Sequence, residues 1–256
     1  CPAPLRSSTG AFGAAGGARA LLKQLSTLLD LDALTVTGQT LREHVAEAVV
    51  DDAGVIRPLD RPFARHASIV VLRGTLAPDS AIIRPGLHRP GADGRFEGSA
   101  LVFDGVPEAI AAVQRGDLKP GQVLVLRGCG PKGGPAMAGS ASRVVFAIYA
   151  AGLENDAAFV SDGQLSGLCN KGMTVAEVSP ESAVGGPLAL VENGDRIRID
   201  IDGRSLDLDV AEAELAARRA RRGDVALPPS TGYLSIYQRS VQPMSTGAVL
   251  VEKGRR

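Results

Sequence analysis

The sequence contains no tryptophan, and aromatic residues make up only 4% of its 256 residues. Because bases stack on aromatic side chains in single-strand-binding proteins, a partner of that kind is disfavoured. Positive and negative side chains balance at 28 each, so the strong positive field that a phosphate backbone or an anionic lipid surface attracts is absent. The longest apolar run, residues 144–151, is far shorter than the roughly 20 residues that span a bilayer. We therefore expect neither a nucleic-acid nor a membrane partner.

Cysteine is also scarce, with three residues and no CxxC spacing. This odd count argues against a disulfide framework and against a self-contained zinc site, and it favours a reducing cytoplasm. The chain begins at Cys1 with neither an initiator methionine nor a signal peptide, so we expect it to come from a longer protein. Its length suits one large domain or two small ones.

Glycine is abundant at 31 residues and proline at 16, and apolar residues make up 45%. Helical spacing of leucines predicts a helix over 14–29, and capping-box spacing from Thr40 predicts another to residue 49. A strand-like stretch, 34–39, lies between them. Beyond residue 68 the pattern predicts mainly short strands and a few helices. The expected strands are 69–72, 81–83, 100–103, 123–126 and 157–160, and the expected helices are 107–114, 140–151 and 211–221.

Alternating isoleucines predict the clearest hairpin, with an Asp202-Gly203 turn that places Arg198 opposite Asp207 and Arg196 opposite Asp209. The helix after it ends in a basic cluster, which we interpret as a solvated helix end that suits the helix dipole, or alternatively as a binding patch. The cluster comprises Arg218, Arg219, Arg221 and Arg222. We interpret residues 226–256 as a linker and a docking tail, because two of the three tyrosines stand at 233 and 237.

A glycine-rich loop, residues 128–137, follows a predicted strand and precedes a predicted helix. Exposed backbone amides and the ammonium of Lys132 would suit an anion there, either a carboxylate or a phosphate. The spacing is not that of a Walker loop. A tight crossover without a ligand is the alternative interpretation.

A second loop, residues 161–172, also follows a buried strand and carries Ser166 between polar and glycine residues. The GxSxG elbow of serine hydrolases is displaced by one position, and all three histidines precede the serine, so a serine hydrolase is disfavoured. Cys169 could be a reactive thiol, although a small buried residue is the commoner fate. We expect the three histidines to be polar surface or loop residues.

Together these motifs resemble the iron–sulfur dehydratases, the family of dihydroxy-acid, phosphogluconate and sugar-acid dehydratases. The matching stretches occur in the family's order over residues 11–225. They are Leu34-Thr35-Val36-Thr37-Gly38, Val55-Ile56-Arg57-Pro58-Leu59-Asp60, Leu72-Arg73-Gly74-Thr75-Leu76-Ala77-Pro78, Val102-Phe103-Asp104, Gly130-Pro131-Lys132-Gly133-Gly134-Pro135, Ser161-Asp162-Gly163, Ser166-Gly167, Val178-Ser179-Pro180-Glu181 and Gly185-Gly186-Pro187.

The resemblance covers only the C-terminal part of such an enzyme. It implies a mixed α and β fold, a swivelling β/β/α barrel domain with flanking helices, over residues 34–225. Residues 1–33 would then be a helical segment of a missing upstream domain. The implied complete enzyme is a homodimer that holds a 2Fe–2S cluster and Mg²⁺ mainly in that upstream domain. None of Cys1, Cys129 and Cys169 matches a cluster ligand, so we expect no metal in this chain alone.

The implied activity converts a 2,3-dihydroxy acid or a sugar acid to a 2-keto acid, and we expect the isolated chain to be inactive. The resemblance places the catalytic base, a serine alkoxide activated by neighbouring cations, at Ser166. It places substrate binding at Lys132, Gly133, Gly134, Thr35, Thr37 and Gly38.

Three departures from the family stand out. Gly139 replaces a glutamate that binds Mg²⁺, Cys129 replaces an acidic residue, and Gly163-Gln164-Leu165-Ser166 replaces Gly-Arg-Phe-Ser. Loss of an anionic ligand weakens a divalent-cation site. A non-catalytic binding or regulatory domain of the same fold is therefore the alternative.

Overall fold

The computed structural model describes residues 7–63, 69–85, 94–134, 140–167, 169, 172–223 and 227–251. Cys1, His66, His88 and residues 135–139, which include Gly139, lie outside them. The chain forms two compact units, Cys1–Ala67 and Ser68–Arg256, which are described here one at a time. The first unit runs to Ala67, whereas the sequence placed a domain boundary after residue 33.

Short helices make up the regular structure of the first unit: α1 (Thr9–Ala14), α2 (Gly17–Gln24), the 3₁₀ turn η1 (Ser26–Leu28) and α3 (Leu41–Val45). The single helix expected over 14–29 is wrong, because Gly16 adopts a left-handed φ of 107° between α1 and α2. A side chain there would meet the Val49 carbonyl oxygen at 2.3 Å. The capping box at Thr40 is confirmed: its hydroxyl accepts from the Glu43 amide, and the Glu43 carboxylate accepts from the Thr40 amide.

The stretch 34–39 is not a strand in the structure. Only a bridge between Leu34 and Thr40 closes a tight turn, in which the Thr35 amide donates to the Gln39 carbonyl. This unit has a small core of its own around Ala15, Ala20 and Ile56.

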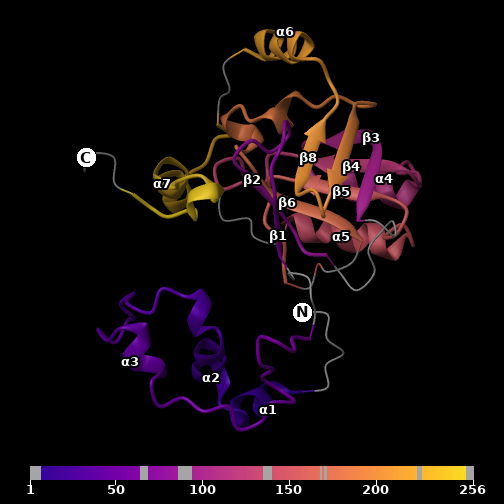
Figure 1. Cartoon of the computed structure of the whole chain (residues 1–256). Coiled ribbons are helices and arrows are strands. Elements are labelled where there is room, and N and C mark those ends of the chain that lie inside the picture. Colours follow the sequence, from indigo (N-terminus) through magenta and orange to yellow (C-terminus); the bar gives the residue numbers. More distant parts are fainter. Residues whose placement is uncertain are drawn as a thin grey trace. The chain divides into compact units, whose positions relative to one another are not determined.

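Eight strands form one sheet in the second unit, in the order β1-β2-β6-β5-β4-β3-β7-β8 (Figure 1). Their bounds are β1 (Val70–Leu72), β2 (Ser80–Ile83), β3 (Arg95–Phe103), β4 (Gln122–Leu126), β5 (Ala158–Ser161), β6 (Met173–Ser179), β7 (Arg196–Asp200) and β8 (Ser205–Leu208). The end strands meet, because Arg73 bridges to Ser205 and the Leu206 amide donates to the Arg73 carbonyl at 3.1 Å. The sheet is therefore a nearly closed barrel, and the expected mixed α and β barrel with flanking helices is confirmed.

The long strand β3 turns the corner of the barrel. Its first half pairs with β7 in antiparallel fashion, and its second half pairs with β4 in parallel. At Gly98, before the switch, a side chain would meet the Gly121 carbonyl oxygen at 2.4 Å. Glycine is needed at this bend because the backbones approach so closely.

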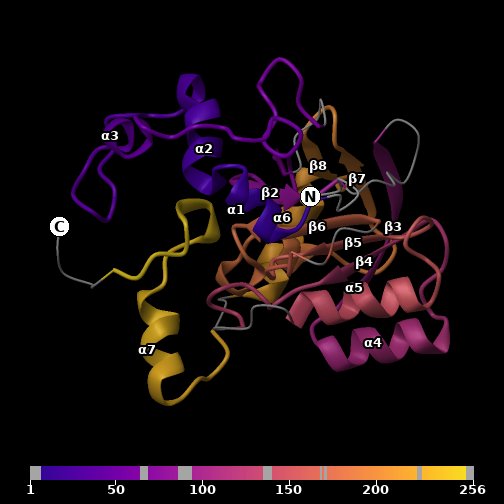
Figure 2. The ribbon, with the colours of Figure 1, turned by 90° about the horizontal axis from the view of Figure 1, so that it is seen from below.

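Alternation along the central strands divides the apolar side chains between two cores. In β4, Val123 and Val125 fill the barrel interior, whereas Leu124 and Leu126 face the outer layer. That layer consists of α4 (Val106–Arg115) and α5 (Ser140–Ala150), which lie side by side on one face of the barrel (Figure 2). Both helices match the predicted 107–114 and 140–151 closely.

The remaining elements of this unit are the 3₁₀ turns η2 (Ser182–Val184), η3 (Pro187–Leu190) and η4 (Met244–Thr246), and the helices α6 (Glu212–Arg222) and α7 (Gly232–Ser240). The register predicted for the β7–β8 hairpin is confirmed, since Arg198 stands opposite Asp207. Within the described residues, no helix is long and apolar enough to cross a membrane.

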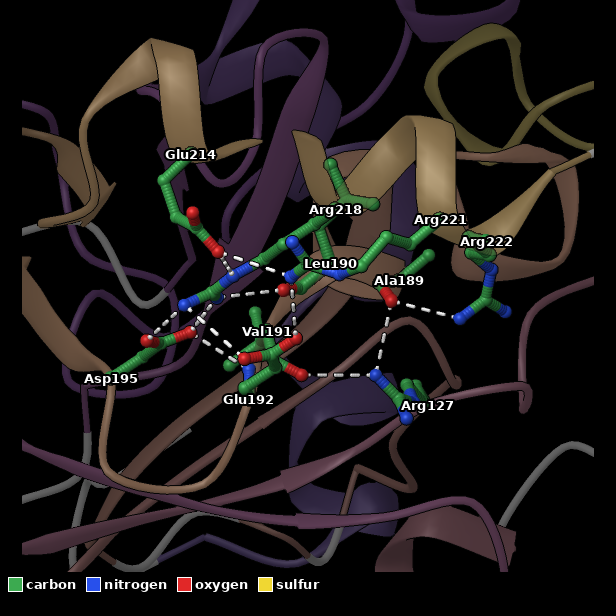
Figure 3. A network of polar contacts seen from close by, with 10 residues as sticks. All are labelled: Arg127, Ala189, Leu190, Val191, Glu192, Asp195, Glu214, Arg218, Arg221 and Arg222. Atoms are coloured by element: carbon green, nitrogen blue, oxygen red, sulfur yellow. Dashed lines mark hydrogen bonds and ion pairs between the residues drawn. The ribbon is translucent and has the colours of Figure 1, made fainter. Parts of the chain in front are cut away.

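Arginines of α6 lie in a network that wraps η3 (Figure 3). The Arg218 side chain is 10% exposed, and it pairs with Asp195 and Glu214 while donating to the Leu190 carbonyl at 3.0 Å. Arg127 and Arg222 both donate to the Ala189 carbonyl, at 3.1 and 2.9 Å. The interpretation of a solvated helix end is therefore wrong for Arg218, but it holds for Arg219 and Arg222, which are exposed.

Candidate functional site

Three parallel strands, β4, β5 and β6, end at the same edge of the barrel. The loops that follow them are residues 127–134, which carry Lys132, residues 162–172, which carry Ser166, and residues 180–186. Carboxyl ends of neighbouring parallel strands are where α/β proteins commonly gather functional side chains. The two loops selected from the sequence therefore share one edge with a third that the sequence did not single out.

Asp162, which follows β5, holds the three loops together. Its carboxylate is 1% exposed and accepts from the amides of Gly128 at 3.1 Å, Cys129 at 2.9 Å and Ser182 at 2.9 Å. It also accepts from the Ser182 hydroxyl. Four donors on one buried carboxylate compensate for its removal from water. The Asp162 carboxylate thus has a structural role, because it binds backbone amides of the glycine-rich loop in place of an external anion.

Glu181, which follows β6, likewise binds amides of the glycine-rich loop, at later positions than Asp162 does. Its carboxylate accepts from the amides of Lys132 at 3.0 Å and Gly133 at 2.9 Å. Burial raises the pKa of Glu181 above its usual value, although these two amides act to lower it. The Gly134 amide donates to the Gly130 carbonyl at 2.8 Å. A substrate anion would have to displace Glu181 in order to use the Lys132 and Gly133 amides.

The tail covers the outer side of this loop. The Lys132 ammonium donates to the Gln238 carbonyl at 3.3 Å, and the Gln238 side chain donates back to the Lys132 carbonyl at 2.6 Å. Gln238 is 6% exposed, whereas Tyr233 on the same helix is 69% exposed. A cavity of about 30 Å³ remains between Lys132, Glu181 and Met244, with room for little more than one water molecule. A buried glutamine, and not Tyr233, therefore ties α7 to the loop.

Ser166 lies half-buried in the second loop. Its amide donates to the hydroxyl of Ser142 on α5 at 2.8 Å, and its carbonyl accepts from the Cys169 amide at 3.0 Å. This loop touches the first at Gly163, where a side chain would meet Cys129 Cβ at 2.8 Å. The serine therefore sits in a polar turn beside the lysine loop and not within packed hydrocarbon.

The structure describes two cysteines, Cys129 and Cys169, and both are shielded from solvent. Burial, with the nearby charge of Asp162, raises the pKa of the Cys129 thiol to about 12. Cys169 is 2% exposed and packs in the outer core, so the expectation of a small buried residue is confirmed. A protonated thiol is a poor nucleophile and a poor metal ligand.

The other predicted site residues fall elsewhere. Thr35, Thr37 and Gly38 belong to the first unit, in the turn closed by Leu34 and Thr40, and their part in a site stays a prediction. Among the residues that the structure describes, no three His, Cys, Asp or Glu side chains gather as a metal site. Sequence reasoning missed Asp162 and Glu181 as ligands of the loop. Both stand in stretches that match the family, Ser161-Asp162-Gly163 and Val178-Ser179-Pro180-Glu181, but only Asp162 closely follows a predicted strand.

We expect Gly130→Ala to destabilise the second unit by about 2 kcal/mol, because an added methyl group overpacks the loop. An ideal Cβ at this position would lie 2.4 Å from the Glu181 carboxylate and 2.8 Å from Glu181 Cβ. Urea unfolding followed by circular dichroism measures the effect. Gly13→Ala is the matched control, since no atom lies within 4 Å of its added Cβ. Equal midpoints for the two variants would contradict the tight packing of Gly130 on Glu181.

Comparison with known proteins identifies a family and several relatives. The family described as dihydroxy-acid/6-phosphogluconate dehydratase C-terminal matches residues 54–248. The chain is 42% identical over 238 residues to the dihydroxy-acid dehydratase of Ignicoccus hospitalis, covering 92% of this chain and 43% of that protein. It is 41% identical over 246 residues to that of Agathobacter rectalis, covering 94% and 43%. Identity to that of Moorella thermoacetica is 42% over 240 residues, covering 92% and 43%.

The fold defines a nearly closed β-barrel domain with three loops gathered at one edge. The chain belongs to the dihydroxy-acid/6-phosphogluconate dehydratase C-terminal family, because the family match spans most of its length. It spans about 43% of the length of these curated relatives.

Proposed function

We propose that this chain is the C-terminal domain of a hydro-lyase that converts a 2,3-dihydroxy acid to a 2-keto acid. The observation that carries the proposal is identity of 41–42% over more than nine-tenths of the chain to proteins named dihydroxy-acid dehydratase. Ser166, in a polar turn at the loop edge, is the proposed base. A branched dihydroxy acid is the preferred substrate, and a sugar acid is the alternative.

In the proposed reaction Ser166, as the alkoxide, removes the proton on C2. The electrons of that C–H bond form the C2–C3 double bond while hydroxide leaves C3. The hydroxide takes the proton now on the Ser166 hydroxyl and becomes water, which regenerates the alkoxide, and the C2 hydroxyl of the enol keeps its own proton. The enol then takes a proton at C3 and becomes the 2-keto acid. A serine hydroxyl needs neighbouring positive charge to act in this way.

Lys132 is the proposed contact for the substrate carboxylate. Its ammonium donates to the Gln238 carbonyl, which leaves two of its three protons for an anion. The amides of Gly133 and Gly134 donate within the chain, so their predicted contribution is to shape the loop.

The resemblance also implies a 2Fe–2S cluster, Mg²⁺ and a homodimer in the complete enzyme. The described residues do not fit either metal group, since they gather no set of three ligands and the Cys129 thiol is protonated. We therefore propose that residues outside this chain hold both groups. Residues 1–33 and the tail, 226–256, are proposed to pack against other parts of that assembly.

The test is to assay the full-length protein and this chain alone, each with a branched 2,3-dihydroxy acid and with a pentonate, and to measure 2-keto acid as its hydrazone. We expect the full-length protein to turn over the branched acid and this chain to be inactive. Turnover by this chain alone would overturn the need for the remainder. A full-length protein that binds but does not dehydrate either acid would favour a non-catalytic domain.

A further inference from the structure

Glu177 occupies an unusual position on β6. It has a φ of 56°, a left-handed conformation that few residues other than glycine adopt. The register between β2 and β6 shifts at this point: Ile82 pairs with Ala176, but Ser80 pairs with Ser179, so β6 carries one extra residue. This is a β-bulge, a feature that commonly re-aims a side chain beside a functional site.

The bulge faces the Ser166 loop. The Glu177 amide donates to the Gly163 carbonyl at 3.1 Å, three residues before the serine. This contact joins the residue with the left-handed φ to the loop. Local strain of this kind persists only where surrounding contacts enforce it, and it concentrates at functional sites.

Arg84, which directly follows β2, approaches the same loop from the other side. One guanidinium nitrogen, Nη1, lies 3.4 Å from the place that a Cβ on Gly167 would take. Because Gly167 has no side chain, the guanidinium can lie against the peptide that joins it to Ser166. Arg84 itself is half-buried.

The two charges act on each other. Burial raises the pKa of Glu177, and the positive charge of Arg84 opposes that rise. Two other buried carboxylates near this edge, those of Asp162 and Glu181, already accept hydrogen bonds from loop amides. Arg84 and Glu177 are thus two half-buried charges of opposite sign beside the turn that carries the proposed base.

We propose that Arg84 supplies, from this chain, positive charge that stabilises the alkoxide of Ser166, and that Glu177 is a positioning residue that holds the guanidinium at the turn. The proposal rests on the proposed function of Ser166. Lys132 is already the proposed contact for the substrate carboxylate, and its ammonium also donates to the Gln238 carbonyl on the tail. A nearby cation favours the charged form of a hydroxyl and so lowers its pKa.

The first experiment compares Arg84→Ala, Arg84→Lys and the matched control Arg143→Ala in the full-length protein. Arg143 is exposed on α5, one residue from Ser142. We expect Arg84→Ala to lower kcat about 100-fold with little change in KM, because the charge acts on the base and not on substrate binding. Arg84→Lys should retain more activity. Guanidinium ion at millimolar concentration should restore part of the Arg84→Ala activity.

Guanidinium rescue separates a charge effect from a purely structural one. Loss of activity in Arg84→Ala without any rescue, accompanied by a lower melting temperature, would overturn the proposal. So would an unchanged kcat. Glu177→Gln should lower kcat less than Arg84→Ala does, since it displaces the cation but does not remove it.

A second measurement uses this chain alone and needs no activity. The Glu177 carboxyl is titrated by ¹³C NMR in the unsubstituted chain and in Arg84→Gln. Because the Arg84 charge lowers the pKa of Glu177, its removal should raise that pKa further. An unchanged pKa would overturn the pairing of the two residues. If the pKa rises but Ser166→Ala leaves turnover intact, the proposed function fails while the pairing stands; if Ser166→Ala abolishes turnover but Arg84→Ala does not, only the role of Arg84 fails.

Discussion

Ser166→Ala is expected to lower kcat of the full-length protein about 1000-fold, because removal of a general base costs between two and four orders of magnitude. KM should change little, since the hydroxyl acts on the C2 proton and not on the substrate carboxylate. The backbone of the turn should survive, because two bonds do not use the removed hydroxyl: the Ser166 amide donates to the Ser142 hydroxyl, and the Ser166 carbonyl accepts from the Cys169 amide.

The measurement is steady-state formation of 2-keto acid, with circular dichroism to confirm folding. Ser235→Ala is the matched control, since its hydroxyl donates to the Gly232 carbonyl on α7, at a position with no proposed role. Ser142→Ala offers a graded comparison: it removes the acceptor of the Ser166 amide and should cost about tenfold through misplacement of the turn. If Ser166→Ala keeps the activity of the unsubstituted protein, another group removes the proton.

Arg218→Met is expected to destabilise the second unit by about 3 kcal/mol, because it leaves the Asp195 carboxylate buried without its cation. The side chains of Arg218 and Asp195 are each only 10% exposed, and the Leu190 carbonyl loses a donor as well. For a unit of this size the melting temperature should fall by about 6 to 12 °C.

Thermal unfolding followed by circular dichroism measures this effect. Arg219→Met, at an exposed position on the same helix, should change the melting temperature little. Combining Arg218→Met with Asp195→Asn should recover part of the loss. The amide oxygen of asparagine can still accept from the Glu192 amide, while the unpaired charge is gone. An unchanged melting temperature in the single variant would show that the pair is solvated.

Local patterns along the chain predicted several elements well. The capping box at Thr40 requires residues only three apart, and the β7–β8 register follows from alternation across a short turn. Both depend on neighbours in sequence, so both can be seen there. The strand β6 escaped notice because its run of apolar residues is interrupted by Glu177, and a bulge has no local signature in a non-glycine residue.

The prediction of a single helix over 14–29 is wrong because of a contact between residues that are distant in sequence. Its leucine spacing is genuine, but Gly16 packs against the Val49 carbonyl, a contact made by a residue more than thirty positions away. Close approach of two backbones outweighs local propensity, which is worth under about 1 kcal/mol for a glycine.

The sequence by itself determined the family, because its motifs resemble that family's in the same order. It also determined the strand-rich second unit and the two loops that meet at one edge of the barrel, because apolar alternation and glycine positions are local properties. Only the tertiary structure decided what those loops bind. The glycine-rich loop reads as an anion site, yet the Asp162 and Glu181 carboxylates already accept hydrogen bonds from its amides. Likewise Arg84, which follows β2, and Glu177, on β6, approach the loop that carries Ser166 at Gly167 and Gly163. Buried amides and charges need partners in the folded chain. These partners can lie far away along the sequence, so the sequence does not show which residue each one will be.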